Sequence, residues 1–590
     1  MKKITKVIAA ATALSAALGV CAYAAEDTIE DKVIAGYQAW FNTEGDGSPR
    51  NEWVHWGRPE VGHLTFDAYP DVRDYSVEDL KETYFAELGN GEKSKLFSSY
   101  RAGVIDKHFE MMHDYGIDGV AVQRFGSVTI NGVEERFKNS VDILKNVKAS
   151  AEKHNELFYV MYDISGLSEE NLVEDLKADW QQVILNDLDI TSSPSYAKDN
   201  GRPVVCLWGL GIREGTGEQY SELIDWFHDK GCYVIGGVSK SWRDQIAKDE
   251  AMEKAFCKLD MLSPWSVGSA KTDSDVDSDA SILAADKAYL DEKGIAYQPV
   301  MFPGFSWSNW KDNAVRNQIP RRAGDFMWRQ AYNIAKQDIH CGYIAMFDEY
   351  DEGTAILKLA EDSSMIPKDQ YFITASADGS YTSSDLYMRL AGYIPKVLRG
   401  EEEITEEMPL LLSEGPVYFR SGFEKYFDAQ PVDGNGELVK DELTYNGRYA
   451  LKLNRVGGGG EMLTKLSELD FSAEKINIGI SAYLAGGSAE LSVGLETADG
   501  DVLYSDLSFA NGKWTYNTLT DISVAGKNIT GLILKAKGTD DYKIYIDDVI
   551  VTEDASLINS QVNGSKYDLY ARNLYNLGLL DGENADKFVM

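Results

Sequence analysis

Between about residue 30 and residue 400, short apolar runs alternate with amphipathic segments, and this alternation restricts the folds open to the chain. Several of the apolar runs are continuous, as in strands of a parallel sheet that is covered on both faces. Helical periodicity fills the segments between them, for example residues 101–115, 141–154 and 220–230. Eight runs have the composition of strands, namely residues 33–41, 116–125, 157–165, 203–210, 232–239, 261–267, 297–305 and 342–348.

Eight strand–helix repeats within residues 28–400 predict an α/β domain, a (β/α)8 TIM barrel with inserted loops. The alternative is an open, doubly wound sheet, which would carry a glycine-rich phosphate turn after its first strand. No such turn follows residues 33–41. The barrel is therefore the favoured interpretation.

The composition changes after Arg399. Five glutamates between residues 401 and 407 indicate an acidic linker, which we assign to residues 401–415. In residues 416–553 the helical period is replaced by short alternating strands separated by Gly, Asn and Asp. This pattern predicts an all-β jelly-roll sandwich. The last segment, residues 554–590, has a helical pattern but is too short to bury a core alone.

The first 24 residues have the features of a secretory signal peptide. Three lysines in the first six positions precede an apolar run at residues 7–22, and Ala22-Tyr23-Ala24 is a small-x-small cleavage site. We expect cleavage after Ala24 and a secreted protein. A lipoprotein anchor at Cys21 is the alternative, but Val20 before it fits the usual small residue poorly.

The formal net charge of −37, from 95 acidic and 58 basic side chains, makes nucleic acid and anionic lipid unfavourable partners. No later run reaches the ~18 apolar residues of a membrane span. Tyr and Trp are abundant, at 33 and 12 copies, which suits stacking on neutral ligands such as sugars. Four cysteines follow the signal segment without a C-x-x-C pair, and we expect buried free thiols.

Polar and aromatic residues end nearly every predicted strand of the barrel. In a (β/α)8 enzyme the active site lies at the C-terminal ends of the strands, so these residues should meet at one rim. Each one taken singly could pack in the core, but together they predict a carbohydrate-type cleft. They are Tyr37, Gln38, Trp40, Gln123, Arg124, Phe125, Tyr162, Asp163, Trp208, Trp265, Phe305, Ser306 and Trp307.

The eighth predicted strand runs into Asp348-Glu349-Tyr350-Asp351-Glu352, which has four carboxylates within five residues. Two charges ~4 Å apart repel by about 4 kcal/mol at an effective dielectric of ~20, so one or more pKa values should rise. A pair of carboxyl groups with separated pKa values is what cleavage of a glycosidic bond requires. A solvated acidic loop or a calcium site would show the same spacing.

Other chemistries have weaker support. None of the seven histidines forms an H-x-x-x-H or H-x-H pair, so we predict no metal and no cofactor. No G-x-S-x-G nucleophile elbow is present, which removes the usual motif of a serine hydrolase. His55 stands out because Trp53 and Trp56 flank it, as would suit a sugar subsite, although a packed loop histidine is the commoner case.

Motifs along the whole barrel resemble those of glycoside hydrolase families 71 and 99, which include α-1,3-glucanases and endo-α-mannosidases. The resemblance implies that Glu349 and Glu352 are the two catalytic carboxyl groups. Asp348 stands where those families have Asn, and Tyr350 matches the family 71 aromatic. The matching segments are residues 36–41, 53–56, 119–125, 161–166, 303–307, 319–322 and 346–354.

By this resemblance, Glu352 is the general acid and then the base for water, while Glu349 takes the proton of the sugar 2-hydroxyl, giving a 1,2-anhydro sugar. The implied protein is an endo-acting glycoside hydrolase with an α-mannan-like polysaccharide as substrate. An α-1,3-glucanase and a non-catalytic glycan-binding barrel remain alternatives. The residues expected to bind sugar are Tyr37, Trp40, His55, Gln123, Arg124, Tyr162, Asp163, Trp208, Trp265, Trp307 and Asp348.

The sandwich resembles a carbohydrate-binding module. Trp514 and Tyr516 alternate along one predicted strand and could form a stacking platform, while Trp514 could equally lie in the core. Asp547 and Asp548 could hold a structural calcium ion or simply end a polar strand. Residues 570–582 resemble the start of an S-layer homology repeat, which suggests attachment to a cell wall.

Overall fold

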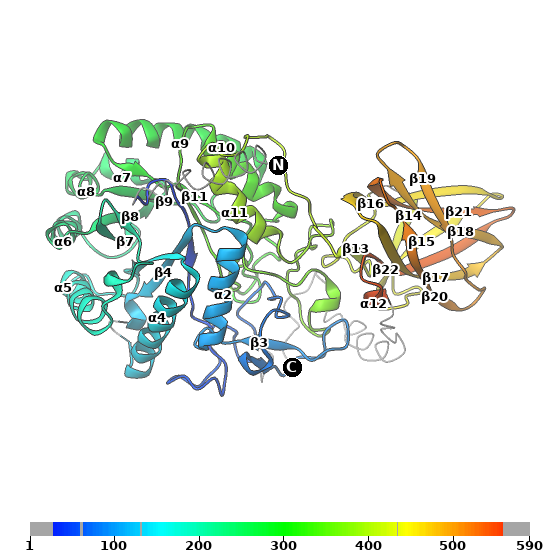
Figure 1. Cartoon of the computed structure of the whole chain (residues 1–590), viewed down its shortest axis with the longest axis horizontal. Helices are drawn as coiled ribbons and strands as arrows, with labels where there is room; N and C mark the ends of the chain where they lie inside the picture. Colours follow the sequence, from blue (N-terminus) through cyan, green and yellow to red (C-terminus); the bar gives the residue numbers. More distant parts are fainter. Residues whose placement is uncertain (1–27, 60–62, 130–131, 433–434, 559–590) are drawn as a thin grey trace, which may run out of the picture.

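The structure is a computed structural model and describes residues 28–59, 63–129, 132–432 and 435–558. A barrel of parallel strands surrounded by helices lies beside a β-sandwich, which is at the right of Figure 1. Both parts of the predicted fold class are thereby confirmed. The barrel strands are β1 (Val33–Tyr37), β4 (Gly119–Phe125), β5 (Leu157–Asp163), β7 (Arg202–Leu210), β8 (Tyr233–Ser239), β9 (Met261–Trp265), β10 (Ala296–Tyr297), β11 (Val300–Met301) and β12 (Gly342–Ile344).

The barrel closes through its seventh strand, which is broken into β10 and β11. The strand order is β10-β9-β8-β7-β5-β4-β1-β12-β11, and every neighbouring pair is parallel. Only Gln298 and Pro299 separate β10 from β11, so the two ends of this order belong to one strand. The order therefore matches eight strands that succeed one another around a ring, as the alternation predicts.

Helices cover the outside of the barrel (Figure 1). Two of them begin with a capping box: Thr216 and Gln219 bond reciprocally at the start of α6, and Thr272 and Asp275 do so at α9. α2 ends where Gly116 adopts a left-handed φ of 72°. The helices are α2 (Ala102–Tyr115), α4 (Glu134–His154), α5 (Leu172–Asp179), α6 (Gly217–Asp229), α7 (Trp242–Ile246), α8 (Glu250–Phe256), α9 (Asp273–Lys293), α10 (Asp325–Ala335) and α11 (Leu386–Leu398).

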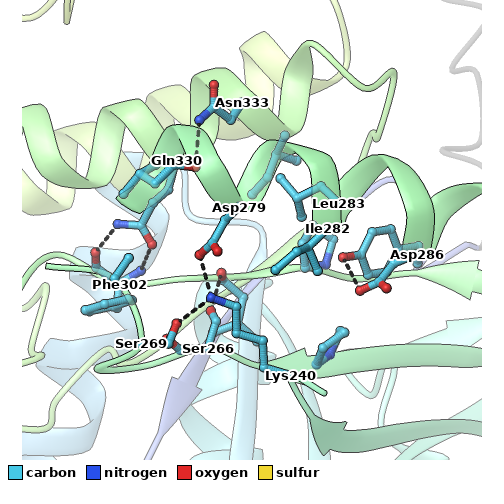
Figure 2. Close-up of a pocket in the computed structure, with 17 residues that line it drawn as sticks. Lys240, Ser266, Ser269, Asp279, Ile282, Leu283, Asp286, Phe302, Gln330 and Asn333 are labelled. Carbon is cyan, nitrogen blue, oxygen red and sulfur yellow. Dashed lines mark hydrogen bonds and ion pairs between the residues drawn. The ribbon is translucent and has the colours of Figure 1, made fainter. Parts of the chain in front are cut away.

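Polar side chains join the helical layer to the strands around a cavity of about 60 Å³, shown in Figure 2. Lys240 Nζ lies 2.6 Å from Asp279 Oδ2 of α9 and 2.9 Å from Ser269 Oγ. Gln330 of α10 accepts a hydrogen bond from the backbone N–H of Phe302 and donates one to its carbonyl. These bonds satisfy groups that helix packing would otherwise leave unpaired.

The sandwich consists of two antiparallel sheets. The first has the order β14-β15-β22-β17-β20 with β13 against β22, and the second has the order β16-β21-β18-β19. Side chains such as Ile478, Leu491 and Leu532 are buried in one apolar cluster. The strands are β13 (Val417–Ser421), β14 (Gly436–Lys440), β15 (Tyr449–Arg455), β16 (Gly460–Ser472), β17 (Lys475–Gly486), β18 (Ala489–Thr497), β19 (Val502–Asp506), β20 (Trp514–Ser523), β21 (Asn528–Gly538) and β22 (Tyr542–Thr552).

Residues 399–416 contain no helix or strand, in a stretch that is described throughout. The helix α12 (Ala555–Ile558) is the only helix in the described part of the C-terminal segment, and the predicted signal peptide lies outside the described residues. Cys206, Cys232 and Cys341 are buried free thiols, as predicted, while Cys257 is half-buried. Among the described helices, none combines the length and apolar character that would cross a membrane.

Candidate active site

Strand register brings aromatic and acidic groups together at the C-terminal rim of the barrel. Phe125 of β4 pairs with Asp163 of β5, and Asp163 pairs with Trp208 of β7. The indoles of Trp208 and Trp265 meet edge to face, with centroids 5.2 Å apart. Each of these side chains lies at or near the end of its strand, so they form one continuous part of the rim.

A rigid turn follows the eighth strand and carries the acidic cluster. The backbone N–H groups of Thr354 and Ala355 donate to the carbonyl of Glu349, at 3.1 and 2.9 Å. The buried guanidinium of Arg321 donates to the carbonyls of Gly353 and Ala355, at 2.8 and 2.7 Å. These bonds fix the direction in which the carboxylates of residues 348–352 leave the backbone.

Asp348 is fully buried and holds the loop that follows β1. Its two oxygens accept hydrogen bonds from the backbone N–H groups of Gln38 and Ala39, at 2.7 and 2.8 Å. Ala39 has a left-handed φ of 48°, which this clamp helps to maintain. Burial raises the pKa of Asp348 to about 7 despite these bonds. The contacts give Asp348 a role in positioning the loop.

Glu349 is held by two side-chain donors. Gln38 Nε2 lies 3.2 Å from its Oε1, and the Thr354 hydroxyl donates to its Oε2 at 3.0 Å. Burial raises the pKa of Glu349 well above its usual value, and the charges of Glu352 and Asp351 raise it further. The two donors oppose this effect by stabilising the carboxylate. Glu349 is therefore an oriented group whose protonation depends on the charges of Glu352 and Asp351.

Glu352 is less buried than Glu349, and within the described ranges nothing donates a hydrogen bond to its carboxyl group. Burial, followed by the charge of Asp351, raises its pKa to about 7, and the Lys311 ammonium opposes the rise. A carboxyl group with this pKa is protonated in about half of the molecules at neutral pH. Glu352 thus meets the main requirement for a general acid.

Asp351 links the acidic turn to an aromatic stack. Its Oδ2 lies 2.7 Å from Nδ1 of His55, whose ring stacks on Trp40 with centroids 3.8 Å apart and planes at 8°. Trp40 also stacks on Phe125, with centroids 5.2 Å apart. Burial raises the pKa of Asp351 and lowers that of His55 to about 3. The stack lies at the same rim as the carboxyl pair.

A cavity of about 280 Å³ opens beside this stack, and His55, His63, Trp310 and Asp351 are among the residues that line it. Oδ1 of Asp351 is buried and has no hydrogen-bond partner within the described parts of the chain. Trp310 is 46% exposed. An unpartnered acceptor beside an exposed indole is the combination that a sugar hydroxyl and a sugar face would satisfy.

Three of the residues expected to bind sugar lie away from this rim, in the packing between strands and helices. Arg124 binds Asp179 of α5 through two hydrogen bonds of 2.6 and 2.5 Å, and the Tyr162 hydroxyl donates to the same Asp179 at 2.7 Å. Tyr37 is fully buried, with its hydroxyl 2.9 Å from His108 of α2. These contacts serve the fold.

The other expected residues remain near the rim. Gln123 is half-buried, and its Nε2 lies 3.8 Å from Met346 Sδ. Asp163 accepts a hydrogen bond from the backbone N–H of Ser165, and burial raises its pKa. Trp307 packs against Trp310 with centroids 6.3 Å apart, and its neighbour Ser306 donates its backbone N–H to the carbonyl of Glu352. Their contact with sugar stays a prediction.

Sequence reasoning did not single out Thr354, Lys311, Trp310 or Arg321 as parts of the site. Thr354 and Arg321 stand within segments that resemble the glycoside hydrolase motifs. Because both side chains donate hydrogen bonds, the sequence could have indicated them as groups that hold the acidic turn. Trp310 and Lys311 lie in a long insertion whose position only the tertiary structure reveals. In the described residues, no group of three or more His, Cys, Asp or Glu side chains is arranged to hold a metal ion.

No protein-family model matches the chain, and no curated protein matches it. Solved structures that it resembles include the GH99 endo-alpha-mannosidase from Bacteroides thetaiotaomicron, at 14% identity over 63% of this chain and 99% of that one, with a TM-score of 0.48. A glycoside hydrolase-like protein matches at 14% identity over 57% of this chain and 98% of that one, with a TM-score of 0.38. The C-terminal part resembles the CBM22-1 xylan-binding domain of Xyn10C from Paenibacillus barcinonensis, at 20% identity over 23% of this chain and 94% of that one, with a TM-score of 0.19.

Proposed function

We propose that the chain is a secreted, endo-acting glycoside hydrolase that cleaves an α-linked, α-mannan-like polysaccharide through Glu352 and Glu349. The observation that carries this proposal is the carboxyl pair at the end of the eighth strand. One member is held by Gln38 and Thr354, and the other has no donor in the described structure and a pKa of about 7. A carboxyl pair with unequal environments is the requirement of glycoside hydrolysis.

In the proposed reaction, the Glu352 carboxyl group donates its proton to the glycosidic oxygen as the bond from that oxygen to C1 breaks. The Glu349 carboxylate takes the proton of the sugar 2-hydroxyl, and O2 forms a bond to C1, giving a 1,2-anhydro sugar. Water then attacks C1 with Glu352 as the base that takes its proton, the C1–O2 bond breaks, and O2 recovers its proton from Glu349. Both carboxyl groups end in their starting states.

The stereochemistry of this route selects the substrate class. O2 can displace the leaving group only when the two are trans, as in an α-mannoside. In an α-glucoside they are cis, so an α-1,3-glucanase would need a different use of the same two groups. Tyr350, the residue that matches family 71, is fully buried and donates its hydroxyl to the carbonyl of Lys358. Its identity therefore does not favour glucan over mannan.

Aromatic groups at two parts of the rim give the proposed cleft its sugar-binding surface. Trp40 and His55 form one side, and Trp208 with Trp265 forms another part of the rim. Indole faces bind the apolar faces of sugar rings without requiring charge. In the sandwich, Trp514 is half-buried and packs against Tyr445 and Tyr483, so its sugar-stacking role is part of the proposal.

Glu352→Gln tests the proposal. Full-length protein is incubated with α-mannan, α-1,3-glucan and xylan, and released reducing ends and product lengths are measured. We expect cleavage of α-mannan to internal fragments by the wild type and a loss of about 10²–10⁴-fold in the variant. Glu403→Gln, in the exposed acidic stretch, is the matched control and should retain full activity. Equal activity of Glu352→Gln and the wild type would contradict the assignment.

Secretion is the second part of the proposal and rests on the features of residues 1–24. Expression of the full coding sequence should place the enzyme outside the cytoplasm with a mature N-terminus at Ala25. Retention of an intact leader inside the cell would contradict it.

A truncated chain ending at residue 558 tests attachment to a cell wall. Loss of wall binding with unchanged hydrolysis would support a wall-binding tail.

A further inference from the structure

A cleft of about 510 Å³ lies between the barrel and the sandwich, and its lining residues do not include the acidic turn of the eighth strand. Its volume falls in the range of about 300–1,000 Å³ that is typical of small-molecule sites. The barrel contributes residues 69–73, 88–90, 92, 362–368 and 370, and the sandwich contributes residues 420–422, 424, 445–447 and Tyr516, among others. Neither domain could form this cleft alone.

The walls of the cleft are fixed by hydrogen bonds that cross from one domain to the other. Ser363 donates its backbone N–H and its hydroxyl to the two oxygens of Asp428, at 2.8 and 2.9 Å. The Thr374 hydroxyl donates to the carbonyl of Phe427 at 2.6 Å. Such fixed walls reduce the entropy that a ligand must overcome to bind.

Arginine and carboxylate groups line the centre of the cleft with hydrogen-bonding capacity to spare. Arg420 Nη1 donates to Ser364 Oγ at 3.3 Å and lies 3.7 Å from Asp362 Oδ2. Asp362 is 1% exposed, and its Oδ2 has no hydrogen-bond partner in the described ranges. On the barrel side, Arg73 binds Glu361 at 2.7 Å with its side chain 53% exposed. Oδ2 of Asp362 is thus ion-paired with Arg420 but accepts no hydrogen bond, and a ligand donor can satisfy a buried oxygen in this state.

Two parallel tyrosine rings form the sandwich side of the cleft. The rings of Tyr445 and Tyr516 have centroids 6.4 Å apart and planes at 10°. Gly479 allows this arrangement, since a Cβ at that position would lie 2.2 Å from the Tyr516 hydroxyl oxygen. Next to the rings, Asn446 donates its side-chain amide to Asp548. Rings beside amide, guanidinium and carboxylate groups match the apolar faces and hydroxyls of a sugar.

We propose that this interdomain cleft is a second glycan-binding site, which holds a neutral segment of the polysaccharide away from the catalytic carboxyl pair. The site deepens the proposed function and rests on it for the identity of the glycan. An anionic ligand is disfavoured by the net charge of −37 and by the carboxylates in the cleft. Two of these carboxyl groups are partly protonated near neutral pH, since burial raises the pKa of Asp548 to about 7 and that of Glu424 to about 8.

The test measures binding of soluble α-mannan, α-1,3-glucan and xylan by affinity electrophoresis, with full-length Glu352→Gln as the non-hydrolysing parent. Tyr516→Ala and Tyr445→Ala remove the sandwich wall, and Arg73→Ala removes a group of the barrel wall. Tyr504→Ala, at a 39% exposed ring on the other sheet, is the matched control. We expect the three cleft variants to weaken binding of one glycan about tenfold and the control to leave it unchanged.

Thermal unfolding identifies any variant that has lost its fold. Arg73 also binds the buried carboxylates of Asp71 and Glu361, so Arg73→Ala is compared only if it stays folded, and it then decides the outcome because it lies on the barrel side of the cleft. Loss of affinity in both Tyr516→Ala and Arg73→Ala supports a site built by two domains. Loss in the tyrosine variants alone, or unchanged affinity in all three, overturns it. The two proposals can fail separately. If Glu352→Gln binds a glycan through the cleft but the wild type cleaves none of the three glycans, the cleft is supported and the proposed hydrolysis is refuted.

Discussion

The protonation of Glu352 sets the expected pH dependence of the enzyme. Its pKa is raised from 4.5 to about 7 by burial and by Asp351. At pH 7 an unperturbed carboxyl group would keep its proton in about 1 of 300 molecules, whereas a pKa of 7 keeps it in about half, which is about 150-fold more. We therefore expect kcat/KM to fall about tenfold per pH unit above about pH 7.

Lys311 provides the perturbation that tests this reasoning. Its Nζ lies 4.1 Å from the centroid of the Trp310 ring and 5.7 Å from that of Trp307, and its charge lowers the pKa of Glu352. Lys311→Met removes that charge, so the pKa of Glu352 should rise. For a partly exposed charge, a shift of about half a unit is reasonable. The basic limb of the profile should move toward alkaline pH by that amount.

Initial rates on soluble α-mannan at subsaturating concentration, between about pH 4 and pH 9, give the profile of kcat/KM. Lys254→Met, in an exposed pair with Glu250, is the control for loss of a positive charge elsewhere and should leave the limb in place. If the alkaline fall of kcat/KM in Lys311→Met moves to lower pH, or if it moves equally in the control, the assignment of Glu352 as the acid is refuted.

Three further predictions concern the groups around the site. Arg124→Met leaves the buried Asp179 without its charged partner and should lower the free energy of unfolding by about 3–5 kcal/mol in denaturant titrations, with KM of the folded enzyme unchanged. A raised KM would instead support a sugar-binding role for Arg124. The pKa of Asp348, raised to about 7, favours the folded state fully below about pH 4, and this contribution is lost as the pH rises through 7. The wild type should therefore lose more stability between about pH 5 and pH 8 than Asp348→Asn, and an equal loss in thermal scans would contradict this. Trp40→Ala removes the ring stacked on His55 and should raise KM about tenfold with little change in kcat, measured against the conservative Trp40→Phe.

The barrel could be predicted because its strands are continuous apolar runs of the length that a buried parallel sheet requires. The first, seventh and eighth strands are those whose length the prediction overestimates most; the first was predicted to end at Phe41 and ends at Tyr37. Residues 297–305 form two short pairings interrupted at Gln298 and Pro299, since proline has no N–H to continue the ladder. In the eighth, the strand ends at Ile344, four residues before the predicted end, although the backbone N–H groups of Ala345 and Phe347 still donate to the carbonyls of Met301 and Gly36.

The separation of rim residues from core residues follows from the two-residue period of a strand. Neighbouring side chains point to opposite faces, so Arg124 and Tyr162 cannot share the face of Phe125 and Asp163. The sequence contained this signal, but it does not say which of the two sets faces the barrel interior. The position of Asp179 shows which set faces the helices, because α5 places this carboxylate against Arg124 and Tyr162.

The carboxyl groups in the acidic cluster of the eighth strand differ in their hydrogen-bond partners. Two backbone N–H groups stabilise Asp348, His55 faces Asp351, and Gln38 and Thr354 hold Glu349. Only Glu352 lacks a hydrogen-bond donor in the described structure, and a carboxyl group without an internal partner loses least when it transfers a proton to substrate. Acidic spacing alone is compatible with a loop or an ion site. The unequal distribution of hydrogen-bond donors, with two on Glu349 and none on Glu352, is what a division into an oriented group and an unheld acid requires.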